Sequence, residues 1–308
     1  MTITSGPTRR ELFAGTAAVL GAGALHATPR RQDENDLFLI SLAQWSLHKK
    51  LKSGELNNLN FARYTKEQFD IHAVEYVNQF FADKATDFDY LGRMKANAES
   101  VGVRSLLIMI VGVGSLAATD EGERQKAIRN HFKWIPAAAF LGCHSIRVNA
   151  GGSNDWDEGM GHAADSLRTL GQIGEDYDIN VIVENHGGLS SNGEWLAGVM
   201  KQAKHPRVGT LPDFGNFHLG QGKQYDRYKG VTELMPFAKA VSAKAHDFDA
   251  DGNETHTDYR RMMKIVIQEA GYRGFVGVEY EGGKHSEDEG ILLTRDLLRT
   301  VRKELQGG

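Results

Sequence analysis

The sequence predicts an α/β fold, a single-domain (β/α)8 TIM barrel, and three observations support this prediction. Short apolar runs alternate along the chain with longer amphipathic stretches, which is the pattern of repeated strand-helix units. The apolar runs number eight, as a closed barrel of this type requires. The 308 residues are enough for such a barrel, which usually takes about 250 residues, together with an extension.

The expected strands are short and mainly apolar, and several begin soon after a helix-ending signal. Gly102, Gly142 and Gly274 each stand shortly before a run, where a glycine would end the preceding helix. A doubly wound open sheet is the alternative fold, but no G-x-G-x-x-G motif follows the first run. The eight runs are residues 38–47, 73–81, 104–112, 145–150, 180–185, 208–214, 240–248 and 275–280.

The stretches between the runs are expected to be helices that cover the barrel. They alternate with the strands to the end of the chain without a break, so a second domain is not expected. The barrel domain is therefore placed at residues 37–308. The main helical stretches are residues 90–101, 121–141, 161–177, 194–203, 258–270 and 287–305.

Residues 1–27 are predicted to be an export signal and not part of the barrel. Arg9 and Arg10 precede an uncharged run of small and apolar residues from 14 to 25, which is typical of a twin-arginine signal peptide. That run has about a dozen residues, whereas a membrane-spanning helix needs about 20, which disfavours the alternative of an uncleaved anchor. Residues 28–36 are a polar linker. We expect a mature chain in the periplasm or outside the cell, without membrane insertion.

The overall composition is that of a soluble globular protein and excludes some partners. Apolar residues make up 41% of the chain and charged residues 25%, which is enough material for a core. The formal net charge of −4 and the lack of a basic cluster argue against nucleic-acid binding. Cys143 is the only cysteine, which excludes an intrachain disulfide, and we expect it to be a buried core residue. Nothing in the sequence indicates an oligomeric state.

Four neighbouring strands each end in a carboxylate or an imidazole. Glu184, Asp213, His246 and Glu279 stand at the expected carboxyl ends of strands five to eight, where a barrel of this type carries its active site. A charge in the mouth of a barrel is costly unless it is paired or binds a metal. Three carboxylates with one histidine form an oxygen-rich set that suits Mn²⁺, Mg²⁺ or a similar ion.

Four segments of the chain resemble the xylose isomerase-like TIM barrels, in particular the group of sugar phosphate isomerases and epimerases. The segments are residues 141–150, 181–188, 244–259 and 271–283, and the resemblance extends over residues 39–301. It implies that Glu184, Asp213, His246 and Glu279 hold one divalent ion, with Mn²⁺ expected first and Mg²⁺, Co²⁺ or Zn²⁺ as alternatives. It also implies that Glu184 and Glu279 are the acid and base pair that moves a proton to and from carbon.

Two positions depart from the pattern of that family. Several of its epimerases carry a histidine three residues after the metal-binding aspartate, where this chain has Asn216. Many members also read His-x-Lys on the seventh strand, where this chain has Ser242, Ala243 and Lys244 before His246. Both departures lie at the predicted site, so they bear on the identity of the substrate and on the reaction.

Seven further residues near the strand ends are expected to contact the substrate, each with a simpler alternative role. The histidines and the asparagine could bind sugar hydroxyls or lie exposed in loops. The arginine and the lysine could meet a substrate oxygen or pair with a barrel carboxylate, and the glutamate could relay a proton or support the metal site. The tryptophan could form a wall for a sugar ring or pack in the core. These residues are Trp45, Arg147, His186, Asn216, His218, Lys244 and Glu281.

The segment that follows His246 imitates a calcium-binding loop. Asp247, Asp249, Asp251 and Gly252, with Asp258 at the twelfth place, match much of an EF-hand pattern. Such a loop lies between two helices, whereas this segment follows an expected strand, and the usual closing glutamate is an aspartate. We therefore expect a βα loop with a tight glycine turn that covers the site.

The expected function is that of a metal-dependent sugar isomerase or epimerase, which moves a proton at a carbon next to a carbonyl. A lyase or dehydratase acting on a keto-sugar is the alternative, because it begins with the same proton abstraction. A non-enzymatic sugar-binding protein is a further option. The fold also occurs in DNA-repair endonucleases, but the acidic net charge and the export signal argue against that class. The expected partner is a small sugar or sugar derivative.

Overall fold

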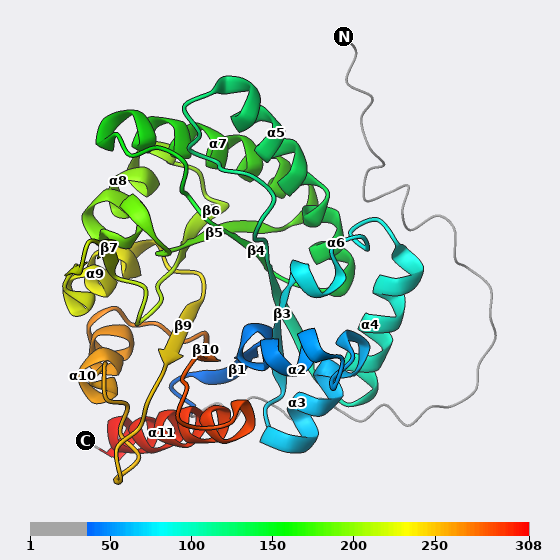
Figure 1. The fold of residues 1–308 in the computed structure, drawn as a ribbon, viewed down its shortest axis with the longest axis vertical. Helices are drawn as coiled ribbons and strands as arrows, with labels where there is room; N and C mark the ends of the chain where they lie inside the picture. The colour runs from blue at the N-terminus through cyan, green and yellow to red at the C-terminus, as the bar shows by residue number, and fades with distance from the viewer. Residues whose placement is uncertain (1–35, 308) are drawn as a thin grey trace.

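Eight parallel strands lie at the centre of the molecule and helices surround them (Figure 1). The computed structural model describes residues 36–307. The predicted signal peptide at residues 1–27 and residues 28–35 of the predicted linker lie outside the described residues. Within residues 36–307, no helix combines the length and the apolar character that a membrane span requires.

The strands pair in chain order around a closed barrel, which confirms the predicted (β/α)8 fold. The sheet runs β6-β5-β4-β3-β2-β1-β10-β9, and its two outer strands, β6 and β9, meet through the parallel bridges Thr210–Ala238 and Asp213–Ser242. The barrel strands are β1 (Leu39–Ala43), β2 (Ala73–Val77), β3 (Arg104–Met109), β4 (Ser145–Val148), β5 (Asn180–Glu184), β6 (Val208–Leu211), β9 (Val241–Ala245) and β10 (Phe275–Tyr280).

Most barrel strands are shorter than predicted at their carboxyl ends. The chain after β1 forms a 3-10 turn, η1 (Gln44–Leu47), and the chain after β2 forms a second one, η3 (Asn78–Phe81). Both turns bury apolar side chains, those of Leu47 and Phe81, against the core between barrel and helices. An apolar residue in a buried turn looks like strand in the sequence, which is why the predicted runs continued too far.

The helices cover the outside of the barrel, and six of them begin with the same device. An Asp or Asn side chain accepts a backbone N–H of the first turn at the start of α4, α5, α7, α8, α9 and α10. The helices are α2 (His48–Ser53), α3 (Phe61–Phe69), α4 (Phe88–Ser100), α5 (Glu121–Phe132), α6 (Trp134–Leu141), α7 (Trp156–Tyr177), α8 (Gly193–Ala203), α9 (Arg227–Leu234), α10 (Tyr259–Lys264) and α11 (Glu287–Gly307).

Two predicted helices are not continuous. The stretch at residues 121–141 divides into α5 and α6 at Lys133, because Pro136 has no backbone N–H for the bond that would join them. The stretch at residues 258–270 changes after α10 into a π-helical turn, η6 (Ile265–Glu269). A short hairpin of β7 (His218–Gly220) and β8 (Lys223–Gln224), which the sequence reading missed, stands outside the barrel.

The apolar residues form two separate clusters. The larger one fills the space between the barrel and the helices and includes Cys143, whose predicted burial is confirmed. The smaller one lies inside the barrel. Its members are Ala43, Val77, Leu107, Met109, Ile182, Leu211 and Ala240. This inner cluster plugs the barrel, so polar side chains gather where it ends, at the carboxyl ends of the strands.

The segment after His246 is the loop with a glycine turn that the sequence predicted. The carboxylate of Asp249 accepts the backbone N–H groups of Asp251 and Asn253, both at 2.9 Å. Gly252 adopts a φ of 79°, which closes the turn. The Asp249 side chain therefore stabilises the loop through hydrogen bonds with backbone N–H groups of the same loop.

Candidate active site

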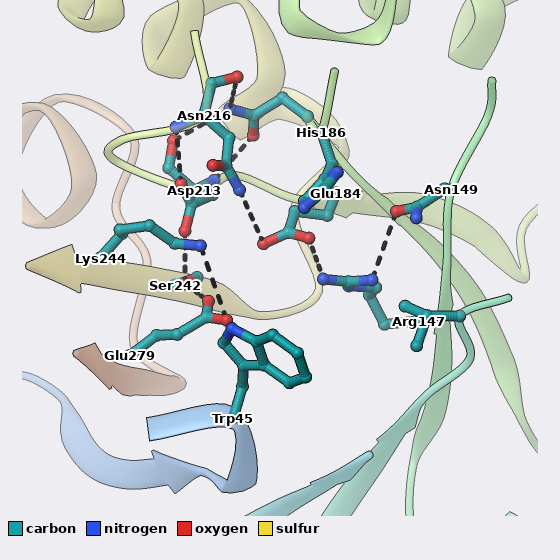
Figure 2. A network of polar contacts seen from close by, with 12 residues as sticks. Trp45, Arg147, Asn149, Glu184, His186, Asp213, Asn216, Ser242, Lys244 and Glu279 are labelled. Atoms are coloured by element: carbon teal, nitrogen blue, oxygen red, sulfur yellow. Dashed lines mark hydrogen bonds and ion pairs between the residues drawn. The ribbon is translucent and has the colours of Figure 1, made fainter. Parts of the chain in front are cut away.

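Three of the predicted side chains come together inside the barrel mouth (Figure 2). Glu184 ends β5, Asp213 follows β6 by two residues, and Glu279 lies near the end of β10. All three are buried, and each offers a carboxylate oxygen within 4.8 Å of the other two. We call Glu184, Asp213 and Glu279 the carboxylate trio.

Asp213 is held in place by its neighbours and not by the strand itself, since β6 ends at Leu211. The side chain of Asn185 accepts the backbone N–H of Asp213 at 2.7 Å and donates to its carbonyl at 3.0 Å. One Asp213 oxygen also accepts the backbone N–H groups of Gly215 and Asn216, at 2.9 and 2.8 Å. Sequence reasoning missed Asn185, although its place directly after Glu184 was the available signal.

Ser242 on β9 joins two members of the trio. Its hydroxyl lies 2.6 Å from Asp213 Oδ2 and 2.9 Å from Glu279 Oε2. A serine hydroxyl has one proton to donate, so it cannot satisfy both carboxylates while both are ionised. The contact therefore calls for a further positive charge at this point, supplied either by a proton on one carboxylate or by a cation.

Two cations balance part of the negative charge. Arg147 on β4 forms an ion pair with Glu184 and lies 3.3 Å from Asn149. Lys244 on β9 lies 3.6 Å from Glu279 and 3.0 Å from Glu281. With Glu281 included, four carboxylates face two cations, which leaves two negative charges when every group is ionised. One divalent cation would neutralise that excess.

Burial changes the protonation of the trio. Desolvation raises the pKa of Glu184 to about 8, although Arg147 opposes the shift, and the nearby Glu279 and Asp213 charges add to it. Desolvation likewise raises the pKa of Glu279, against the effect of Lys244. Without a further cation Glu184 holds a proton near neutral pH, and a bound cation would displace it.

His246 does not lie with the trio. It stands one residue past the end of β9. Its possible ligand atom lies within 4.8 Å of those of Glu254 and His256 in the following loop. The rings of His246 and His256 are 5.3 Å apart, and Glu254 accepts the backbone N–H of His246 at 3.2 Å. The structure thus brings three of the four predicted ligands together and places the fourth in a separate group.

A cavity of about 230 Å³ opens beside the trio and receives most of the predicted substrate-binding residues. Trp45, Arg147, His186, Lys244 and Glu281 line it, together with Glu279. The indole N–H of Trp45 donates to Glu281, which gives the tryptophan a polar contact, and the ring of Trp45 stacks on that of His48. The remaining wall combines the apolar Val77, Met109 and Val111 with the amides of Gln79 and Asn149.

Two predicted residues lie elsewhere. Asn216 donates to Glu184 at 3.4 Å and so supports the trio from the loop after β6. His218 is exposed at the start of the β7–β8 hairpin and is not part of the cavity wall.

Glu75 is a buried carboxyl group that sequence reasoning missed. It lies on β2 inside the barrel, where Ser41 donates to it at 2.6 Å. Gly277 makes room for it, since a Cβ there would come within 2.5 Å of the Glu75 carboxylate. Burial raises the pKa of Glu75 to about 7. No local feature distinguishes it from an exposed strand glutamate.

The comparisons with known proteins agree with this architecture. The family described as xylose isomerase-like TIM barrel matches residues 67–302. A search of the curated proteins finds no match.

Solved structures share the fold at low sequence identity. The apo form of 3-keto-D-glucoside 4-epimerase from E. coli is 16% identical, with a TM-score of 0.62 over 80% of this chain and 94% of its own. A probable 3-DHS dehydratase from Bacillus anthracis is 14% identical, with a TM-score of 0.63 over 85% and 98%. The IOLI protein with a bound zinc atom is 14% identical, with a TM-score of 0.67 over 86% and 98%. At these identities the likeness establishes the fold alone.

Proposed function

Because the chain belongs to the xylose isomerase-like TIM barrel family, we propose that it is a metal-dependent sugar isomerase or epimerase. The reaction would move a proton at a carbon next to a carbonyl group. The observation that carries this proposal is the carboxylate trio, which is buried, short of positive charge and adjacent to a cavity with polar and apolar walls. Among the solved structures of the same fold is a sugar epimerase, and another holds a zinc atom.

The trio fits one divalent ion. Its ligand atoms lie close together, all are oxygens, and the surrounding charges leave an excess of two negative charges. Oxygen donors favour Mn²⁺ or Mg²⁺ over the softer ions, and Mn²⁺ is the ion we propose. When bound, such an ion would polarise the substrate oxygens as a Lewis acid.

The two glutamates have separate roles in this proposal. Glu279 lines the cavity, so it can reach a substrate carbon and remove its proton. Glu184 lies on another strand, between Arg147 and Asn216 and within 4.8 Å of Glu279, and would return the proton from that side (Figure 2). Arg147 orients Glu184, and Ser242 orients Glu279. Burial raises the pKa of each carboxyl group, which opposes the lowering effect of a bound cation and keeps the group basic.

The cavity favours an uncharged sugar. Arg147 and Lys244 are the cations of its wall, and carboxylates already engage both of them. A phosphate dianion would therefore have to compete with those carboxylates for the same two cations. We also propose that the predicted signal at residues 1–27 exports the chain, which would place it among unphosphorylated sugars.

Proton exchange with solvent tests this function. The purified chain with Mn²⁺ is incubated with keto-sugars in D₂O, and the products are followed by NMR. We expect deuterium at the carbon next to the carbonyl, together with an isomer or epimer, and loss of both signals after chelation. An unsaturated product would instead establish the lyase alternative. Sugar binding without any exchange would overturn the enzymatic proposal.

A further inference from the structure

Strand β9 lies between strand β10, which carries Glu279, and the segment after β6, which carries Asp213. It contributes a lysine to the surroundings of the trio. Its inward-facing residues at the mouth are Ser242 and Lys244. Ser242 bridges to Asp213 on one side, and Lys244 pairs in register with Glu279 on the other. Between Asp213 and Glu279, the strand therefore places a hydroxyl and an ammonium group. It offers neither a carboxylate nor an imidazole as a metal ligand.

The side chain of Lys244 is buried and held by its neighbours. Only 3% of its side chain is exposed, and its Nζ lies 3.0 Å from Glu281 and 3.6 Å from Glu279. A Cβ on Gly215 would come within 2.9 Å of the lysine stem, so that glycine leaves the space the stem needs. Trp45 holds Glu281 from its other side. The ammonium group is thus fixed at the wall of the cavity, beside the proposed base.

A fixed cation in this place has two physical consequences. It repels a divalent ion bound by Glu279, since two positive charges about 4 Å apart near a protein surface interact by several kcal/mol. It also offers N–H donors to the cavity, where negative charge appears on a substrate oxygen once a neighbouring carbon loses its proton.

We propose that Lys244, beside a trio whose fourth side is occupied by Ser242, is a fixed cation that competes with the divalent ion for Glu279 and hydrogen-bonds the reacting substrate oxygen. This proposal rests on the proposed function. In the step concerned, the C–H bond breaks, its proton moves to Glu279, and the electron pair passes to the carbonyl oxygen, which accepts an N–H of Lys244. No other reactant is needed.

The test measures ion affinity and turnover separately. Mn²⁺ is titrated by calorimetry into the wild type, Lys244→Met and Lys244→Arg. We expect Lys244→Met to bind Mn²⁺ at least about tenfold more tightly, because a like charge is gone, while its kcat falls about 100-fold. Lys244→Arg keeps the charge and should retain wild-type affinity and part of the turnover. Lys244→Gln provides a second neutral side chain if the methionine variant folds poorly.

Two further variants complete the design. Lys284→Met is the matched control, because Lys284 is exposed and pairs with Asp247 and not with the trio. His246→Gln tests the rival assignment of the fourth ligand. Weaker or unchanged Mn²⁺ binding in Lys244→Met, or loss of binding in His246→Gln, would overturn the proposal. Calorimetry needs no substrate, so tighter binding in a protein that turns over no keto-sugar would reject the proposed function alone.

Discussion

The mouth of the barrel has two halves that share one backbone geometry and differ in chemistry. On β1 to β3, the inward-facing residues near the strand ends are Ala43, Val77 and Met109, all apolar. On β4 to β6, β9 and β10, the corresponding region carries cations and carboxylates. These are Arg147, Glu184, Asp213, Lys244 and Glu279.

The difference assigns separate roles to the two halves of the barrel mouth. The charged half concentrates ionisable groups where burial strengthens every electrostatic interaction, and in the proposed function these groups would hold an ion and move a proton. The apolar half supplies a dry wall against which a sugar ring can lie, and it lowers the local dielectric for the charged half. The charged half depends on the apolar half, because carboxyl groups open to water on all sides would keep their ordinary pKa values.

The largest effect is expected from removing one charge of the charged half. Glu279→Gln keeps the shape of the side chain and abolishes the base, so kcat should fall by at least about 1,000-fold. The drop is measured by the NMR assay with unfolding curves as a check on stability. Glu99→Gln, an exposed substitution on α4, is the matched control. Retained turnover in Glu279→Gln would show that the base lies elsewhere.

The second effect concerns the pH dependence of ion binding. The pKa of Glu184 is raised to about 8, so below that pH the ion must displace a proton. Mn²⁺ affinity should therefore fall about 50-fold from pH 8 to pH 6, with a slope that approaches about tenfold per pH unit well below the pKa. Calorimetry in buffers of different ionisation enthalpy would count the proton released. An affinity that is constant over this range would contradict the assigned protonation.

The third effect lies below the apolar half, at Glu75. Its pKa rises from 4.5 to about 7 on folding, so the folded state holds the proton more tightly than the unfolded state. Stability is accordingly full below pH 4.5 and declines as the pH rises through about 7. Glu75→Gln removes the ionisation, and at pH 8 it should stabilise the protein by about 3 kcal/mol relative to the wild type.

Urea unfolding at pH 5 and pH 8 measures this difference. At pH 5 the two proteins should be close in stability, because Glu75 in the folded wild type is then protonated. Ser41 can donate to a glutamine oxygen as it does to the glutamate. A glutamine variant that is equally destabilised at both pH values would mean that Glu75 serves packing and not charge.

The smallest effect is expected at the edge of the apolar half. Trp45→Ala removes the ring face and should raise KM about tenfold, whereas Trp45→Phe keeps a ring and loses only the N–H to Glu281. Mn²⁺ affinity should change less than KM in both variants, because Trp45 reaches the trio only through Glu281 and Lys244. Trp156→Ala, at an exposed tryptophan, is the control. A change in ion affinity without a change in KM would mean that Trp45 supports the ion site and does not contact the sugar.

Much of the fold could be predicted because its signals are local. Each strand is a short apolar run, and side chains alternate between the two faces of a strand, so residues 182 and 184 of β5 are expected on one side. Glu184 and Glu279 belong to their strands, and that alternation alone directs them together into the barrel. The predicted strand ends were wrong where the apolar side chains of η1 and η3 continue the core.

Non-local contacts decided the rest of the site. His246 stands beyond β9, so its direction depends on the loop that contains Glu254 and His256. Lys244 meets Glu279 through the register of β9 against β10, two strands that lie more than 30 residues apart in the chain. Asn185 and Asp213 hold each other across two loops.

The sequence by itself determined the eight βα units and the two glutamates at strand ends, because strand length and alternation are properties of consecutive residues. The tertiary structure alone decided that Glu184, Asp213 and Glu279 meet as a carboxylate trio beside Ser242 and Lys244, and that Glu75 lies buried beneath an apolar wall. Those facts depend on barrel closure, strand register and exclusion of water, which arise only when residues far apart in the chain pack together.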